Sequence, residues 1–348
     1  MNQEEQSIFQ HIENTSMQNI YACNIFLQAQ NALQQKDFIL AYKLMNIYRN
    51  SILYNDLKTV DNRTNKNPKA SVIVVAYNTQ EDLITCLQSV MDGNEKDIEI
   101  IVVDNGKNDS VVPILLKMDI LYIKTPINLI LSEGRNIGVH FATAPICIFL
   151  DDDAIAPPNF VEKILDVLLD TNLSAIRGKI LPKTTTAFQI AEPCYDLGDI
   201  PIPSVINTEG NSAWRTNIYK EFDGMDPLLF GHEGTELSYR IHQKYSKDAT
   251  FYFPTIYIYH DSAHDEQKSV IKEARHQLMR KYLNWKKEQK VKIAQTIKQN
   301  TLVNLEQRYK KASQWRKVLS LCLLDPKRLK TNIYNKYIEN TKRNSLEK

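Results

Sequence analysis

The residues with the clearest chemical potential are three consecutive carboxylates, Asp151, Asp152 and Asp153, which directly follow the apolar run Ile146–Leu150. Residues two apart on an extended chain point to the same side, so Asp151 and Asp153 are predicted to face one ligand. Adjacent carboxylates repel each other, and a bound divalent cation relieves that repulsion. Hard oxygen ligands select Mg²⁺ or Mn²⁺, which commonly bridge carboxylates to substrate phosphates. The alternative interpretation is a solvated acidic turn, or a cap for the helix that follows.

Two other predicted strands also end in polar residues. Tyr77 and Asn78 follow the run Ser71–Ala76, and Asp104 follows the run Ile98–Val103. In open α/β sheets, ligands bind beyond the carboxyl ends of the parallel strands. A single aspartate after a strand is commonly a turn or cap residue. Three polar strand ends at one edge, however, predict a single ligand-binding crevice.

The predicted elements alternate between strands and helices, which favours a parallel sheet with helices on both faces. Continuous β-branched or apolar runs indicate buried strands, and apolar residues three or four apart indicate helices. The strands are expected at residues 71–76, 98–103, 121–124, 146–150 and 255–260. The helices are expected at residues 81–91, 132–141 and 157–169, with Pro157 and Pro158 opening the last one.

Helical extensions are predicted on both sides of this α/β region. An N-terminal hairpin over residues 1–60, with Asp37 as an N-cap, precedes a polar linker at 61–69. Residues 265–348 contain 22 Lys and Arg against 8 Asp and Glu, a net charge of +14, while residues 1–264 carry −12. This basic helical region is expected to contact an anionic membrane surface or a second copy of the chain, and a solvated helical face is an equally good interpretation. No motif supports nucleic-acid binding.

The overall composition is that of a folded globular protein. Of 348 residues, 43% are hydrophobic and 24% are charged, which argues against disorder. The five cysteines are scattered and form no C-x-x-C pair, which disfavours a disulfide framework and favours a reducing compartment. No secretory signal is evident, and no apolar run approaches the ~20 residues of a spanning helix. A cytoplasmic protein is expected, with peripheral attachment at the inner face of a membrane as a further possibility.

Residues 70–264 resemble a family 2 glycosyltransferase of the GT-A fold, a Rossmann-like α/β architecture with a mainly parallel central sheet. The order and spacing of eight segments carry the resemblance: SVIVVAYN (71–78), IVVDNGKNDS (101–110), NLILSEGRNIG (128–138), FLDDD (149–153), GNSAWR (210–215), FDGMD (222–226), GHEGTELSYR (231–240) and PTIYIYH (254–260). The resemblance implies a metal-dependent, inverting transfer of a sugar from a nucleotide-sugar donor, expected to be a UDP-sugar. The acceptor would be a glycan, a lipid-linked glycan or a protein.

Matching positions within the resemblance imply a donor site and a metal site. The donor would be bound by Ala76, Tyr77, Asp104, Arg135, Asp151, Asp152 and Asp153. Of these, Ala76 and Tyr77 would line the nucleoside pocket, and Asp104 would bond to the base. Asp153 and His260 would hold Mn²⁺ or Mg²⁺, with His264 as the alternative histidine. Imidazole is an acceptable manganese ligand beside a carboxylate.

The expected catalytic base is missing from its usual position. The family usually has Glu-Asp in this segment, with the Asp as general base, but here Glu233 is followed by Gly234. Glu233 is the nearest carboxylate and is predicted to take that role. Glu236 is the second candidate, and the alternative for it is a structural acid at the start of a helix. The segment also resembles polypeptide N-acetylgalactosaminyltransferases, which retain the anomeric configuration. The absence of the usual Asp at position 234 therefore leaves open which residue is the base and, to a lesser degree, whether the transfer inverts or retains configuration.

The acceptor side offers Trp214 and Asn211 as candidates. An exposed tryptophan makes a platform for a sugar ring, although a core tryptophan is an equally good interpretation of Trp214. Two other functions remain open on the sequence alone. One is a catalytically degenerate nucleotide-sugar-binding or scaffold protein, with Gly234 as the lesion. The other is a phosphatase of the haloacid dehalogenase type, which also has Asp-x-Asp after a strand. The phosphatase interpretation leaves residues 210–260 unexplained.

Overall fold

The computed structural model describes residues 16–78, 81–107, 109–183, 195–229, 231–261 and 273. The predictions made for the basic region 265–348 and for His264 therefore concern residues outside the described part, with Glu273 as the exception. The domain boundaries proposed from the sequence stay predictions.

Within the described residues, a nine-stranded sheet forms the centre of the molecule, in the order β1-β4-β3-β2-β5-β8-β6-β9-β7. Strands β4, β3, β2 and β5 are mutually parallel, whereas β8 runs antiparallel to both β5 and β6. The strands are β1 (Lys58–Asp61), β2 (Ala70–Ala76), β3 (Ile98–Asp104), β4 (Leu121–Lys124), β5 (Ile146–Asp151), β6 (Ala175–Leu181), β7 (Ile202–Pro203), β8 (Asn211–Arg215) and β9 (Thr250–Tyr259).

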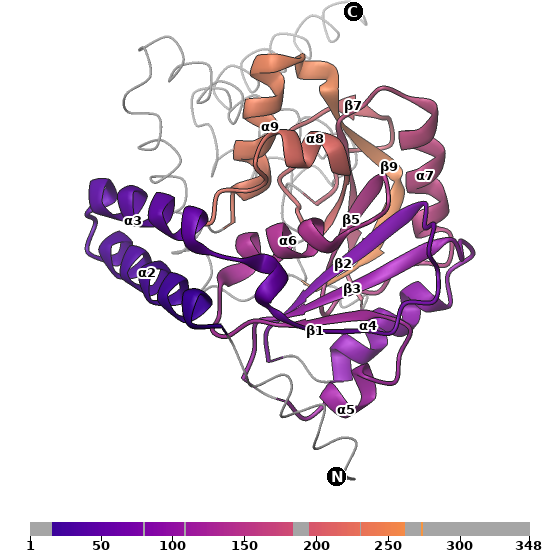
Figure 1. Ribbon diagram of the computed structural model, residues 1–348. Helices are drawn as coiled ribbons and strands as arrows, with labels where there is room; N and C mark the ends of the chain where they lie inside the picture. Colours follow the sequence, from indigo (N-terminus) through magenta and orange to yellow (C-terminus); the bar gives the residue numbers. More distant parts are fainter. Residues whose placement is uncertain are drawn as a thin grey trace, which may run out of the picture.

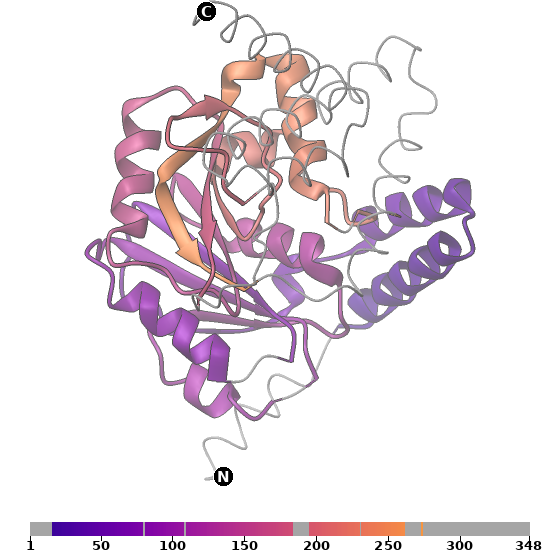
Figure 2. The same ribbon diagram turned by 180° about the vertical axis from the view of Figure 1, so that it is seen from behind.

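Helices cover both faces of this sheet, as the alternating element order predicts (Figures 1 and 2). One layer contains α4 (Glu81–Met91), α5 (Val112–Leu115) and α7 (Phe160–Asp170), and the other contains α6 (Ile130–Phe141), α8 (Thr216–Glu221) and α9 (Glu233–Lys244). Strand β2 supplies both cores because successive side chains point to opposite faces. Val72 and Val74 join the core under α4 and α7, while Ile73 and Val75 join the core under α6.

One predicted helix start is wrong. The sequence places Pro157 and Pro158 in the first turn of a helix, but α7 begins at Phe160, with Asn159 as its N-cap. The prolines form the preceding turn instead, since the Phe160 amide donates to the Pro157 carbonyl at 2.9 Å and Asn94 donates to Pro158 at 2.7 Å. Those backbone acceptors hold the prolines against the loop after α4.

The N-terminal helical hairpin consists of α2 (Met17–Gln34) and α3 (Phe38–Ser51), which lie side by side (Figure 1). Asp37 caps α3 as predicted, because its side chain accepts from the Leu40 amide at 3.1 Å. The hairpin is attached to α6 through Glu133, a fully buried carboxylate. Glu133 accepts from the Tyr48 hydroxyl at 2.7 Å and from Tyr54. Burial raises the pKa of Glu133, an effect that the tyrosine hydrogen bonds oppose.

The segment predicted as a linker is bonded to the domain at its first residues. Asp61 is the last residue of β1, which pairs antiparallel with β4. Arg63 forms ion pairs with Asp61, at 2.7 Å, and with the buried Glu99. Composition alone shows the polarity of this segment but not these tertiary partners. No helix of the described residues has both the length and the hydrophobicity needed to cross a membrane.

Replacing Tyr48 tests the attachment of the hairpin. Tyr48→Phe removes one of the two tyrosine donors to the buried Glu133 carboxylate, and a hydrogen bond to a charged group contributes about 1.5–3 kcal/mol. We expect the free energy of unfolding to fall by that amount in chemical denaturation. Tyr21→Phe, on the exposed side of α2, is the matched control and should leave stability unchanged. Equal stability of both variants would contradict the role given to Glu133.

Candidate functional site

The carboxyl ends of the parallel strands lie side by side, as the polar strand ends predict. In the sheet register Ala76 is opposite Asp104, and Val75 is opposite Asp151. Tyr77 follows Ala76 and has an exposed fraction of 54%, while Ala76 itself is buried. The edge formed by β3, β2 and β5 therefore brings Asp104, Tyr77 and the aspartate triplet to one place.

The three aspartates have three different partners. Asp151 Oδ1 accepts from Arg135 Nη2 at 3.1 Å, Asp152 Oδ2 accepts from the Tyr77 amide at 3.0 Å, and Asp153 Oδ1 lies 2.9 Å from His260 Nε2. The chain turns after β5, where the Ala154 amide donates to the Asp151 carbonyl at 3.0 Å. Each carboxylate therefore has a partner of its own. Asp151 and Asp153 nevertheless both act on His260, because against the lowering effect of burial the charges of both raise its pKa.

Asp153 and His260 form the pair that fits a divalent metal. Burial opposes the charge on each group, but their mutual hydrogen bond prevails, so the pKa of Asp153 is lowered and that of His260 is raised. His260 follows β9, and its Nδ1 is buried without a hydrogen-bond partner in the described structure. No three His, Cys, Asp or Glu side chains cluster as a metal site in the described ranges. Asp153 and His260 would supply two ligands, which suits a divalent ion that takes its remaining ligands from water and from phosphate oxygens.

Asp104 is held at the strand edge by three donors. Its Oδ1 accepts from the Gly106 amide at 2.8 Å, and its Oδ2 accepts from Tyr122 at 2.6 Å and Lys124 at 2.9 Å. The burial of Tyr122 and the nearby Asp104 charge raise the pKa of the tyrosine, which keeps it a donor. A carboxylate accepts about four hydrogen bonds, so one position is left for a ligand. No pattern in the sequence indicates that Tyr122 and Lys124 are the partners of Asp104.

Arg135 connects the aspartate triplet to α9. Its guanidinium lies over the Phe149 ring, 5.5 Å from the ring centroid, and donates to Asp151 through one nitrogen. The other terminal nitrogen donates to Glu233 Oε1 at 3.1 Å. Arg135 and Glu233 are almost fully buried, and Glu233 Oε2 has no hydrogen-bond partner in the part of the chain described. A planar guanidinium with several fixed donors suits such a bridge between two carboxylates.

A second buried carboxylate, Glu209, was missed by the sequence analysis. Glu209 Oε1 accepts from the Gly234 amide at 2.9 Å. Burial and then the charge of Glu233 raise the pKa of Glu209 to about 7, against a lowering effect of Arg135. Glu209 directly precedes the Gly210–Arg215 segment, but no residue spacing indicates that it meets α9. Only the folded chain brings these two acids together.

Three residues predicted for the acceptor side or for catalysis have structural contacts. Trp214 is fully buried, and its Nε1 donates to Ser212 at 3.0 Å, which corrects its assignment as a sugar platform in favour of a core residue. Asn211 is also fully buried and donates to the Lys179 carbonyl at 2.8 Å. Glu236 is buried and forms an ion pair with Arg240 at 2.7 Å, one turn along α9. That contact agrees with the structural alternative for Glu236.

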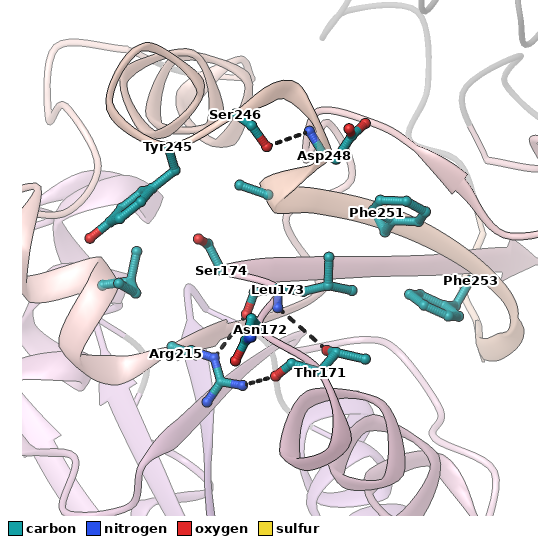
Figure 3. A pocket seen from close by; sticks show the side chains of 12 residues that line it. Thr171, Asn172, Leu173, Ser174, Arg215, Tyr245, Ser246, Asp248, Phe251 and Phe253 are labelled. Atoms are coloured by element: carbon teal, nitrogen blue, oxygen red, sulfur yellow. Dashed lines mark hydrogen bonds between the residues drawn. The ribbon is translucent and has the colours of Figure 1, made fainter.

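A pocket of about 520 Å³ lies at the other end of the sheet (Figure 3). It is formed where β6 and β9 begin, whereas Asp153 and His260 lie where β5 and β9 end. Phe251, Phe253 and Tyr245 contribute aromatic rings to its wall. Arg215, its cationic group, donates to backbone carbonyls, including that of Leu173 at 2.9 Å. This pocket contains none of the residues predicted for donor, metal or catalysis.

Comparison with known proteins shows what the central part of the chain is similar to. Residues 71–194 match the sequence profile of Glycosyl transferase family 2. An uncharacterized glycosyltransferase of Haemophilus influenzae is 30% identical over 99 residues, which are 28% of this chain and 34% of that protein. Glycosyltransferase GlyA of Streptococcus pneumoniae is 34% identical over 107 residues, 29% of this chain and 15% of that protein. The chain thus matches about a third or less of the length of these relatives.

Two solved structures share the fold over most of the chain. TarS of S. aureus, solved with UDP-GlcNAc, has a TM-score of 0.51 at 15% identity and covers 73% of this chain and 79% of its own. The mannosyltransferase PcManGT of Pyrobaculum calidifontis was solved with GDP-Man and Mn²⁺ and has a TM-score of 0.51 at 13% identity. The match covers 95% of this chain and 100% of that chain. The architecture described above is therefore that of the GT-A glycosyltransferases.

The contact between residues 209 and 234 predicts the effect of a small substitution. A Cβ at position 234 would lie 2.8 Å from Glu209 Cγ and 2.7 Å from the Ile206 carbonyl, closer than real side chains pack. We expect Gly234→Ala to lower the free energy of unfolding by about 1–3 kcal/mol, the usual cost of overpacking. Chemical denaturation of Gly234→Ala, Glu209→Ala and the double variant measures the coupling. Strictly additive effects would contradict the packing of Glu209 on Gly234.

Proposed function

We propose that this chain, whose residues 71–194 form a glycosyl transferase family 2 domain, moves a sugar from a nucleotide-sugar donor to an acceptor hydroxyl. The observation that carries the proposal is the shared edge of β3, β2 and β5, where Asp104, Tyr77 and Asp151–Asp153 converge. Ligands bind at such an edge in open α/β sheets. Two glycosyltransferases of the same fold were solved with UDP-GlcNAc and with GDP-Man, which supports a nucleotide-sugar donor here.

The donor would lie across this edge with its base at β3 and its diphosphate at β5. Asp104 has one acceptor position left for a base N–H, and the exposed ring of Tyr77 offers an apolar surface beside it. Asp151, held by Arg135, would lie near the ribose. Uracil is the base expected from the resemblance. Ala76, buried beneath, would close the floor of the nucleoside site.

Asp153 and His260 would hold Mn²⁺ or Mg²⁺ beside the diphosphate. A bound ion of this kind neutralises the charge of a leaving phosphate as a Lewis acid. The Asp153 carboxylate and His260 imidazole already face each other at 2.9 Å, which is a suitable oxygen and nitrogen pair. The mannosyltransferase of the same fold that was solved with Mn²⁺ supports this choice of ion.

Transfer also needs a carboxylate that receives the proton of the acceptor hydroxyl. Glu233, the residue predicted from the sequence, and Glu209 are the buried acids close to Asp151 and Arg135. The acceptor would be a glycan, a lipid-linked glycan or a protein, with inversion at the anomeric carbon. A site that excludes water protects the donor from hydrolysis, and the buried residues around Arg135 favour such exclusion.

Nucleotide binding tests the metal pair directly. Asp153→Ala should abolish the gain in UDP affinity that Mn²⁺ gives to the wild-type chain, because the ion loses its carboxylate ligand. We expect a gain of at least about tenfold in the wild type and none in the variant, measured by titration calorimetry. Asp166→Ala, on the exposed side of α7, is the control. The proposed metal site is wrong if Asp153→Ala keeps the full effect of Mn²⁺.

Attachment to a membrane is proposed for the basic region 265–348, which would bring the enzyme to lipid-linked acceptors at the inner face of a membrane. Each Lys or Arg near an anionic leaflet contributes about 1 kcal/mol, and salt screens the attraction. The full chain should float with vesicles of anionic phospholipid at low salt and be released at high salt. Vesicles of neutral phosphatidylcholine are the control. Equal flotation with both vesicle types, or with neither, would leave self-association as the role of this region.

A further inference from the structure

Glu209 and Glu233 form a pair of buried acids in which only one has an ion pair. Glu233 Oε1 is bonded to Arg135 at 3.1 Å, and the same guanidinium also bonds Asp151. Glu209 has instead a neutral donor, the Gly234 amide at 2.9 Å. The two acids are therefore chemically unequal although they are close together.

The position of Glu209 places it beside the donor edge. The next residue, Gly210, packs directly on Asp151, since a Cβ at 210 would lie within 2.2 Å of the Asp151 carboxyl atoms. Glu209 is thus one residue away from contact with the end of β5. The exposed fraction of the whole residue is 9% for Glu209 and 1% for Glu233, so both acids are buried. Glu209 Oε1 accepts from the Gly234 amide at 2.9 Å.

The glycine at position 234 leaves the space beside the start of α9 that the Glu209 side chain fills. Glu209 Cγ and Oε1 lie 2.8 Å and 2.9 Å from the place where a Cβ of residue 234 would be. The glycine therefore makes room for a carboxylate that comes from the β7–β8 connection rather than from α9. Any larger residue at 234 would occupy the space that Glu209 now fills.

We propose that Glu209 is the catalytic base for the acceptor hydroxyl and that Glu233 is a positioning residue that fixes Arg135 against Asp151. This inference rests on the proposed glycosyl transfer and identifies its proton acceptor. The acceptor O–H bond breaks as its proton passes to the Glu209 carboxylate. The acceptor oxygen then forms the bond to the anomeric carbon. The bond from that carbon to the diphosphate oxygen breaks, and the nucleoside diphosphate leaves with the electron pair.

The electrostatics of the pair suit this role at neutral pH. Burial, and then the Glu233 charge, raise the pKa of Glu209 to about 7, while Arg135 acts in the opposite direction. A general base is most effective when its pKa is close to the working pH. The charged groups that surround Glu209 are Glu233 on α9, Arg135 on α6 and Asp151 at the end of β5.

The experiment measures release of nucleoside diphosphate from UDP-GlcNAc and from GDP-mannose with Mn²⁺, with water as the acceptor, and binding of UDP and GDP in parallel. Glu209→Gln keeps an oxygen for the Gly234 amide but cannot take a proton. We expect kcat to fall by about 10²-fold or more with nucleotide affinity unchanged. Glu233→Gln should instead weaken nucleotide binding, because Arg135 and Asp151 lose their alignment. Glu221→Gln, an exposed acid on α8, is the matched control and should behave as wild type.

The pH profile separates a base from a merely structural acid. Below about pH 7 the base is protonated, so wild-type kcat/KM should fall about tenfold per pH unit. This acidic limb should disappear in Glu209→Gln, and Glu209→Asp should restore part of the rate. If Glu209→Gln keeps the wild-type rate, or if Glu233→Gln alone removes the acidic limb, the assignment to Glu209 is overturned. A wild-type chain that neither binds these nucleotides nor releases them from donors overturns the proposed function itself.

Discussion

The buried guanidinium of Arg135 is the interaction on which the rest of the site depends. It bonds Asp151 at the end of β5 and Glu233 at the start of α9, so one side chain fixes the sheet edge relative to the helix layer. Removing one member of a buried ion pair costs about 3–5 kcal/mol, because an uncompensated charge remains in the interior. Here two carboxylates share one cation. Burial, and then the charge of Glu233, raise the pKa of Glu209, which lies next to them, while Arg135 lowers it.

Residues on either side of Arg135 in helix α6 contact other parts of the domain. Glu133, two residues before Arg135, is the buried acceptor for the hydroxyls of Tyr48 and Tyr54 from the N-terminal segment. Asn136, the residue after Arg135, bonds both the amide and the carbonyl of Met225 at 2.9 Å. Neighbouring residues of a single helix therefore hold the hairpin, the donor edge and the loop before α9. The hairpin is a structural support for α6 through contacts that lie far apart in sequence.

Under the proposed assignment of the base to Glu209, a chemical role moves between elements of one fold. Gly234 stands where the resemblance to family 2 glycosyltransferases implies an acidic side chain, and Glu209 from another segment fills the space beside it. A glycine at this place is then compatible with an active enzyme, because the proton acceptor depends on where a carboxylate lies and not on which strand or helix supplies it. Fold alone does not determine such an assignment, whereas local geometry and charge do.

The sequence by itself determined the architecture and the sheet edge at which the donor is proposed to bind. Apolar runs such as Ser71–Ala76 and polar strand ends such as Asp104 are local patterns, and local patterns predict strands, their order and their exposed ends. The tertiary structure alone decided which carboxylate meets which cation. The turn after β5 gives Asp151 and Asp153 different hydrogen-bond partners, burial removes Trp214 from the surface, and Glu209 reaches Gly234 across 25 residues. Pairing, burial and pKa depend on distances between segments remote in sequence, and no residue spacing encodes those distances.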